Sequence, residues 1–126
     1  MVSFEEVRNM LDDIAAALPD ELYKGLNGGV ILNEGVKLHP ESRPAAPLYI
    51  MGEYRNEPGG LGRYIVVYYG SFVNVHGYQN TGRQKEALSK TLRHEFLHHL
   101  ESLGGERSLE IEDAIRIAKY KESLGS

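Results

Sequence analysis

The residues best suited to chemistry lie in the segment His94-Glu95-Phe96-Leu97-His98, where two histidines are four positions apart. On a helix, residues at i and i+4 lie one turn apart on the same face, so the two imidazoles are able to converge on one ion. Zn²⁺ held by two imidazoles and one carboxylate keeps an open position for water and lowers the pKa of that water to ~7. Glu95 points to the flank of the histidine pair, where a carboxylate is placed to take the proton from the zinc-bound water. The spacing therefore predicts one zinc ion bound by His94 and His98, with Glu95 as the general base of a hydrolase.

The surrounding apolar residues predict that this motif lies on a helix over residues 83–103. At ~100° per residue, one arc of the helical wheel carries the side chains Leu88, Leu92, Phe96, Leu100 and Leu103. This arc must face the core, so His94 and His98 on nearly the opposite side must face water or a cleft. His99 falls on the apolar side, where a hydrogen-bonded core imidazole is more common than a metal ligand.

The sequence predicts further helices and strands that must position this helix. Ser3 and Glu6 form a capping-box pattern that opens a helix ending before Pro19. Residues 30–32 indicate a short buried strand. An antiparallel hairpin is predicted from two strands, 48–54 and 62–72, joined by a turn at 56–60. A loop is predicted over 73–82, with Thr81 as the N-cap of the helix that follows. A last helix is expected to begin near Ser108. The prediction is an α+β fold with a small twisted sheet of about three to four strands packed against an N-terminal helix, the metal-binding helix and a C-terminal helix.

The composition is that of one ordinary globular domain. A chain of 126 residues with 41% hydrophobic and 25% charged residues suits a single domain over residues 1–126. The net charge of -4 and the lack of a Lys/Arg run argue against nucleic acid as a partner. There is no cysteine, so a tightly held metal must use imidazole, carboxylate or carbonyl groups. No stretch approaches the ~20 apolar residues that span a bilayer, and the first ten residues lack a signal sequence, so we expect a cytoplasmic protein with no membrane partner.

With its motif Arg93-His94-Glu95-Phe96-Leu97-His98-His99-Leu100, the chain resembles the small bacterial zincin-like metallopeptidases, minimal H-E-x-x-H domains with a late helix reading H-E-x-x-H-H. The resemblance extends over most of the chain, including the N-terminal helix and the strands. It implies that His94 and His98 are zinc ligands, that Glu95 is the general base and that the substrate is a peptide or protein. In zincins the strand before the metal helix often forms an edge to which an extended peptide adds, and residues 62–72 are the strand that fits by analogy.

The third zinc ligand does not transfer from the resemblance, because the family pattern places a Gly and an Asp where this chain has Glu101 and Gly104. If the helix runs to Leu103, the following turn lies ~9 Å or more beyond His98, so the chain must double back. A helical hairpin would bring residues 110–113 level with the histidines, which favours Glu110, then Asp113. Glu106 becomes the best candidate only if the helix ends a turn early. Glu101 lies ~10 Å along the axis from His94, which suits a position at the rim of the site better than coordination.

Two other functions fit parts of this pattern. One is a metal hydrolase that acts on another substrate such as RNA, although small bacterial zinc endoribonucleases are expected to be more basic and to carry a third zinc-binding histidine, and neither feature is found here. The other is a non-catalytic zinc-binding module, whose ion would have four protein ligands and no water. The presence of Glu95 favours catalysis, because a structural ion has no use for a neighbouring base.

Overall fold

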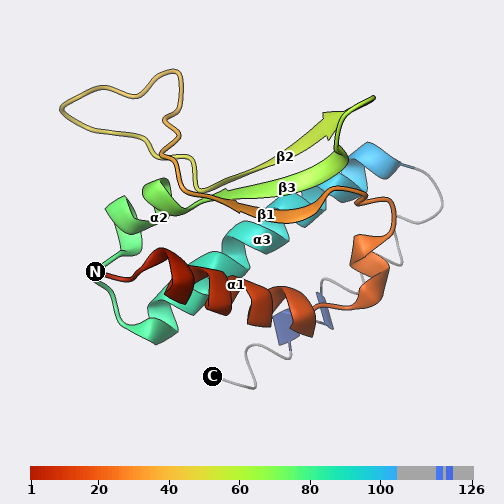
Figure 1. Cartoon of the computed structure of the whole chain (residues 1–126), viewed down its shortest axis with the longest axis horizontal. Coiled ribbons are helices and arrows are strands. Elements are labelled where there is room, and N and C mark those ends of the chain that lie inside the picture. Colours follow the sequence, from red (N-terminus) through yellow and green to blue (C-terminus); the bar gives the residue numbers. More distant parts are fainter. Residues whose placement is uncertain (105–115, 118, 121–126) are drawn as a thin grey trace.

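The computed structural model describes residues 1–104, 116, 117, 119 and 120. Figure 1 shows a small sheet lying across a layer formed by the longest helix and the N-terminal helix. In chain order the elements are α1 (Phe4–Ala17), the 3₁₀ helix η1 (Asp20–Tyr23), β1 (Gly29–Asn33), β2 (Gly52–Glu57), β3 (Gly62–Tyr68), α2 (Tyr69–His76) and α3 (Thr81–Leu103). This confirms the predicted α+β class with a small sheet. The last helix, predicted to begin near Ser108, falls largely outside the described residues.

Helix α1 begins with the predicted capping box. The Glu6 amide donates to the Ser3 hydroxyl at 3.1 Å, and the Ser3 amide donates to the Glu6 carboxylate at 3.1 Å. Two N-terminal amides that lack helical partners are therefore satisfied by side chains. One face of α1 buries Val7, Met10 and Leu11 against the core, and the helix ends at Ala17, before the proline that predicted its end.

The sheet has the spatial order β1-β3-β2 within the described residues. β2 and β3 form the predicted antiparallel hairpin, whereas β1 pairs with β3 in parallel, from Gly29 opposite Tyr64 to Asn33 opposite Tyr68. The hairpin strands are shifted from their predicted positions. The predicted turn at 56–60 moves to residues 58–61, because Gly59 takes the left-handed backbone conformation (φ 84°) that the tight turn needs. β2 therefore continues to Glu57, and the residues before Gly52 are not part of it.

Residues 69–76 form helix α2, so two predictions were wrong: that a strand continues to 72 and that a loop follows over 73–82. Tertiary packing overrides the strand propensity of this aromatic run. Ser71 is fully buried, and its hydroxyl accepts from the Lys37 amide and donates to the Lys37 carbonyl, at 2.9 and 3.1 Å. A side chain at Gly70 would overlap the Gly35 carbonyl oxygen at 2.7 Å, so this glycine allows α2 to pack on the loop after β1.

Helix α3 forms over the predicted stretch but begins at Thr81, two residues before the predicted start at residue 83, and its N-cap is Asn80 and not Thr81. The Asn80 side-chain oxygen accepts from the Arg83 amide at 2.9 Å. The predicted apolar arc faces the core, where Leu88, Leu92 and Phe96 are fully buried. The helix stops at Gly104, whose φ of 56° ends it. No helix within the described part of the chain is long and apolar enough to cross a membrane.

Candidate metal centre

The two histidines of the motif lie side by side on the exposed face of α3, as the helical wheel predicts. Their Nε2 atoms are 3.2 Å apart, and the ring planes are inclined at 86°. Two imidazoles on a tetrahedral Zn²⁺, each with a Zn–N distance of about 2.05 Å, place their nitrogens about 3.3 Å apart. The same distance also suits a hydrogen bond between a ring nitrogen that carries a hydrogen and one that does not. The pair therefore fits the first half of a zinc shell with little rearrangement.

Glu95 lies beneath this pair and is only 6% exposed. Its carboxylate accepts a hydrogen bond from the backbone amide of Tyr54 in β2. Burial raises the pKa of the Glu95 carboxyl, and the neighbouring His94 and His98 oppose that rise only in part. The side chain is thus fixed by the sheet beside the histidines, and it is a stronger proton acceptor than an exposed glutamate.

Gly52 allows β2 to approach α3 at this point. A Cβ atom there would lie 2.9 Å from Thr91 Cγ2, 3.1 Å from the Val66 carbonyl oxygen and 3.5 Å from Glu95 Cγ. A glycine within a strand often marks such a close approach. The contact brings the Tyr54 amide within reach of Glu95.

β2 is an edge strand of the described sheet, and its backbone pattern identifies the groups at the free edge. The Tyr68 amide donates to the Met51 carbonyl at 2.8 Å, so Met51 and every second residue after it face β3. Gly52, Tyr54 and Asn56 therefore direct their backbone groups away from β3. The Tyr54 amide is taken by Glu95, whereas the outward backbone groups of Gly52 and Asn56 are placed to pair with an added strand.

Glu101 lies behind His98, as its predicted rim position requires. The Glu101 Oε2 atom is 3.3 Å from His98 Nδ1, the ring nitrogen that faces away from His94. Metal-binding histidines commonly donate their second N–H to a carboxylate, which fixes the tautomer and the orientation of the ring. Glu101 thus occupies the position of a ligand-orienting carboxylate.

His99 is fully buried, as predicted for a core imidazole. Its Nε2 lies 2.8 Å from the Lys24 carbonyl oxygen, to which it must donate, so its Nδ1 accepts from the Tyr54 hydroxyl at 2.8 Å. Burial lowers the pKa of His99, which keeps the ring neutral in this arrangement. Tyr54 therefore holds α3 twice, through its amide at Glu95 and its hydroxyl at His99. The sequence did not predict this role of Tyr54, which it indicated only as a residue of a strand.

The three candidates for the third ligand, Glu106, Glu110 and Asp113, lie outside the described residues. Within the described part of the chain, no group of three or more histidine, aspartate and glutamate side chains is arranged to hold a metal ion. The described site therefore consists of two imidazoles, a buried carboxylate beside them and a carboxylate behind His98.

An open groove of about 930 Å³ runs from His94 and Glu95 along α3 toward its N-terminus. Ile50, Met51 and Gly52 form the opposite wall, and His76 and Gln79 lie at the far end. The motif thus lies at the mouth of a groove large enough for several residues of an extended chain. We refer to it as the α3 groove.

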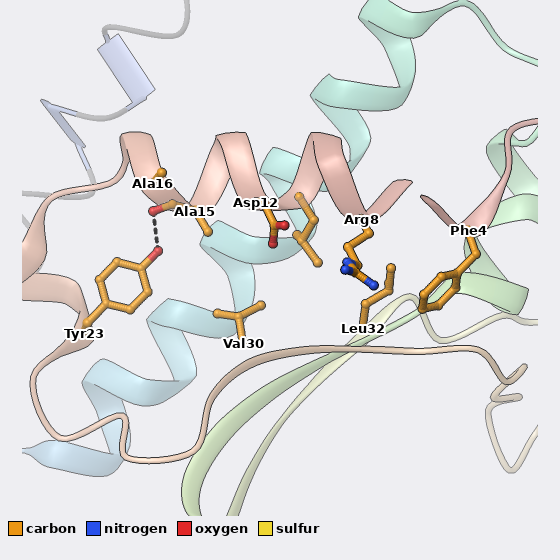
Figure 2. Close-up of a pocket in the computed structure, with 9 residues that line it drawn as sticks. Phe4, Arg8, Asp12, Ala15, Ala16, Tyr23, Val30 and Leu32 are labelled. Carbon is orange, nitrogen blue, oxygen red and sulfur yellow. Dashed lines mark hydrogen bonds between the residues drawn. The ribbon is translucent and has the colours of Figure 1, made fainter. Parts of the chain in front are cut away.

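A second cavity of about 500 Å³ lies between α1 and β1 (Figure 2). Its lining combines apolar side chains such as Val30 and Leu32 with the charged Arg8 and Asp12. The hydroxyl of Tyr23 at one end donates to the Ala15 carbonyl. No histidine is among the described residues that line it. The histidine motif is therefore associated with the α3 groove and not with this cavity.

Together these features define an α+β domain in which a helix-borne histidine pair lies beside the edge strand of a small mixed sheet. No protein-family model matches the chain, and curated proteins give no significant match. Among solved structures, the chain is similar to a conserved hypothetical protein from Thermus thermophilus, with 30% sequence identity and a TM-score of 0.67. The alignment covers 82% of this chain and 98% of that one. The chain therefore belongs to the same family as the Thermus protein.

Proposed function

We propose that the protein is a zinc-dependent metallopeptidase with a minimal zincin-like fold. The observation that carries the proposal is the pair of Nε2 atoms 3.2 Å apart on His94 and His98, with the buried Glu95 beside them at the end of a groove. Bound Zn²⁺ would supply Lewis acidity toward a carbonyl oxygen and make a water molecule more acidic.

In this proposal Glu95 moves the proton. Its carboxylate takes a proton from the attacking water and transfers it to the amide nitrogen that leaves. The Tyr54 amide fixes the carboxylate, and the raised pKa of Glu95 suits it to receive a proton. His94 and His98 hold the ion, and Glu101 orients the His98 ring.

The free edge of β2 supports a peptide as substrate. An extended peptide adds to such an edge through backbone hydrogen bonds, without regard to most of its side chains. By analogy with zincins we expected this edge on residues 62–72, but β3 is the central strand and both its sides are paired. The edge beside the metal helix is therefore β2, where Gly52 and Asn56 direct backbone groups outward.

The third ligand in this proposal is Glu110, with Glu106 and Asp113 as alternatives. A carboxylate from the chain beyond Gly104 completes a site of two imidazoles and one oxygen ligand, and the remaining position stays open. Zinc titrations of Glu110→Gln, Glu106→Gln and Asp113→Asn identify the residue, since only the ligand variant should weaken zinc binding by an order of magnitude or more.

The proposal is tested by measuring zinc content and the cleavage of a peptide library. We expect one zinc per chain in the wild type, loss of zinc in His94→Ala, and full zinc content in His39→Ala, which removes an exposed histidine away from the site. Glu95→Gln should retain zinc but lose at least about 100-fold in cleavage rate, since it deletes the general base.

Equal cleavage by wild type and Glu95→Gln, or no cleavage by the zinc-loaded wild type, would overturn the proposal. Zinc with four protein ligands would instead favour the non-catalytic module. Zinc-dependent cleavage of RNA but not of peptides would favour the alternative function as a metal hydrolase that acts on RNA.

A further inference from the structure

Among its described lining residues the α3 groove has more basic than acidic side chains, although the chain as a whole carries a net charge of -4. Basic side chains along its lining are Arg83, Lys90, Arg93 and Lys119. Among the described residues of the lining the acidic ones are Glu86 and Glu95, and the second of these is the buried general base of the proposed function. The groove therefore differs in sign from the average surface of the protein.

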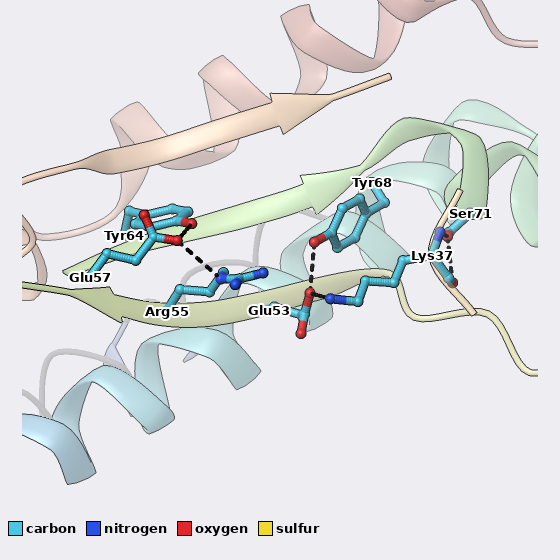
Figure 3. Close-up of polar contacts among 7 residues, drawn as sticks. All are labelled: Lys37, Glu53, Arg55, Glu57, Tyr64, Tyr68 and Ser71. Carbon is cyan, nitrogen blue, oxygen red and sulfur yellow. Dashed lines mark hydrogen bonds and ion pairs between the residues drawn. The ribbon is translucent and has the colours of Figure 1, made fainter. Parts of the chain in front are cut away.

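Basic residues on the outer face of the sheet have carboxylate partners, in contrast to Arg83 and Lys90 of the groove. Figure 3 shows Lys37 paired with Glu53 and Arg55 paired with Glu57 across that face. Within the described residues, no ion pair joins Arg83 or Lys90 to a carboxylate. The charge of the outer face is balanced by neighbouring carboxylates, whereas the described part of the chain supplies no carboxylate partner for these two groove cations, which suits them to bind an acidic ligand.

The N-terminal half of α3 is an unfavourable place for uncompensated positive charge. The helix dipole places partial positive charge at this end, and the first turn contains no acidic residue. Arg83 lies in the first turn and adds to this potential. Residues that oppose local stability in this way are typical of functional surfaces.

We propose that the α3 groove selects peptides with acidic side chains on one side of the cleaved bond. This inference rests on the proposed function for the position of that bond, which lies at His94 and His98. Along the helix axis Lys90 is about 6 Å and Arg83 about 16 Å from His94, at 1.5 Å per residue. An extended peptide advances about 3.3 Å per residue and its side chains alternate between two faces, so the second and fourth residues after the cleaved bond share the face toward α3. Acidic side chains there lie nearest to Lys90 and to Arg83, whose long side chain spans the remaining ~3 Å.

The direction of the peptide follows from the relation of α3 to β2. Gly52 lies against Thr91, and Tyr54 contacts His99, so strand and helix run in the same sense. A peptide paired antiparallel to β2, the slightly more stable arrangement, places its C-terminal part beside Lys90. The acidic residues therefore follow the cleaved bond.

A peptide explains this groove better than an RNA strand does. Single-stranded RNA is held by stacking of its bases on aromatic side chains, and no Phe, Tyr or Trp is among the described residues that line the groove. The outward backbone groups of β2 instead suit a second strand.

The test measures binding separately from cleavage, with zinc-loaded Glu95→Gln protein. The probe is a fluorescein-labelled ten-residue peptide that has glutamate at the second and fourth positions after its central bond. A matched peptide has glutamine at both positions. We expect the acidic peptide to bind about threefold to tenfold more tightly at low salt, as for two exposed charge pairs, and the difference to fall at 0.5 M salt, where the screening length is short (~4 Å).

Lys90→Glu should abolish or reverse this preference, and Arg83→Glu should reduce it. Lys85→Glu makes the same charge change on an exposed residue of α3 outside the groove lining, and it should leave the preference intact. Circular dichroism of each variant checks that the helix is retained.

Equal binding of the two peptides, or an equal effect of Lys85→Glu and Lys90→Glu, would overturn the inference. Tighter binding of an oligouridine of the same net charge than of the acidic peptide would overturn it in favour of RNA. Cleavage that depends on Glu95 but shows no charge preference would refute the inference alone. Acidic preference in binding without any cleavage by the wild type would refute the proposed function alone.

Discussion

Replacement of Gly52 by alanine tests whether the close approach of β2 to α3 builds the site. The added methyl group would lie 2.9 Å from Thr91 Cγ2 and 3.1 Å from the Val66 carbonyl oxygen, closer than ordinary van der Waals contact. The strand or the helix must move by a few tenths of an ångström. Overpacking of this kind lowers the free energy of unfolding by about 1–3 kcal/mol. For a domain of this size each kcal/mol lowers the melting temperature by roughly 4 °C.

A second substitution separates the two clashes. Thr91→Ser removes Cγ2 and with it the shorter contact, so we expect Gly52→Ala with Thr91→Ser to recover about half of the lost stability, while the contact with Val66 remains. Gly60→Ala is the matched control, because its new methyl group has only ordinary contacts, the nearest at 3.6 Å. Urea unfolding followed by circular dichroism gives the four free energies. If Gly52→Ala were as stable as Gly60→Ala, or if Thr91→Ser recovered nothing, the packing argument would be refuted.

Three further predictions concern hydrogen bonds of the sheet and of helix α3. Tyr54→Phe leaves the buried Nδ1 of His99 without its hydrogen-bond donor and should lower the free energy of unfolding by about 1–2 kcal/mol. Urea unfolding measures the change, and an unchanged unfolding midpoint would contradict this hydrogen bond. Burial alone would raise the pKa of Glu53, but hydrogen bonds from Lys37 and Tyr68 lower it below 4.5. Glu53→Gln should therefore destabilise the protein at pH 7, and its difference from wild type should shrink as the pH falls below 4.5; a difference independent of pH would contradict it. Glu101→Gln should weaken zinc binding about tenfold in a competition titration. An unaltered zinc affinity would show that this carboxylate does not orient the His98 ring.

Helix α3 and the histidine pair on it could be predicted from the sequence because their signals are local. The apolar arc and the spacing of His94 and His98 depend only on helical periodicity, and the structure places both as expected. His99 was also correctly assigned to the core. The capping box at Ser3 gave the start of α1 to the residue.

The surroundings of the site could not be predicted because they depend on contacts between distant residues. The identity of the edge strand follows from the parallel pairing of β1 with β3, which no local pattern indicates. Helix α2 forms where an aromatic run favours a strand, since Ser71 and Gly70 pack on the loop after β1. Gly52 did carry a usable signal, because a glycine inside a predicted strand often marks a close approach.

The parallel pairing of β1 with β3 also affects how the chain folds. The β2–β3 hairpin closes through a short turn between Glu57 and Gly62, whereas the pairing of Gly29 with Tyr64 closes a loop of about 35 residues. Closing the longer loop has the larger entropic cost, so we expect the hairpin to form first and β1 to dock last. Pulse-labelling hydrogen exchange would contradict this order if β1 amides became protected before those of the hairpin. The edge strand that faces α3 would then exist before the sheet is complete, and α3 could dock on a hairpin that is already formed.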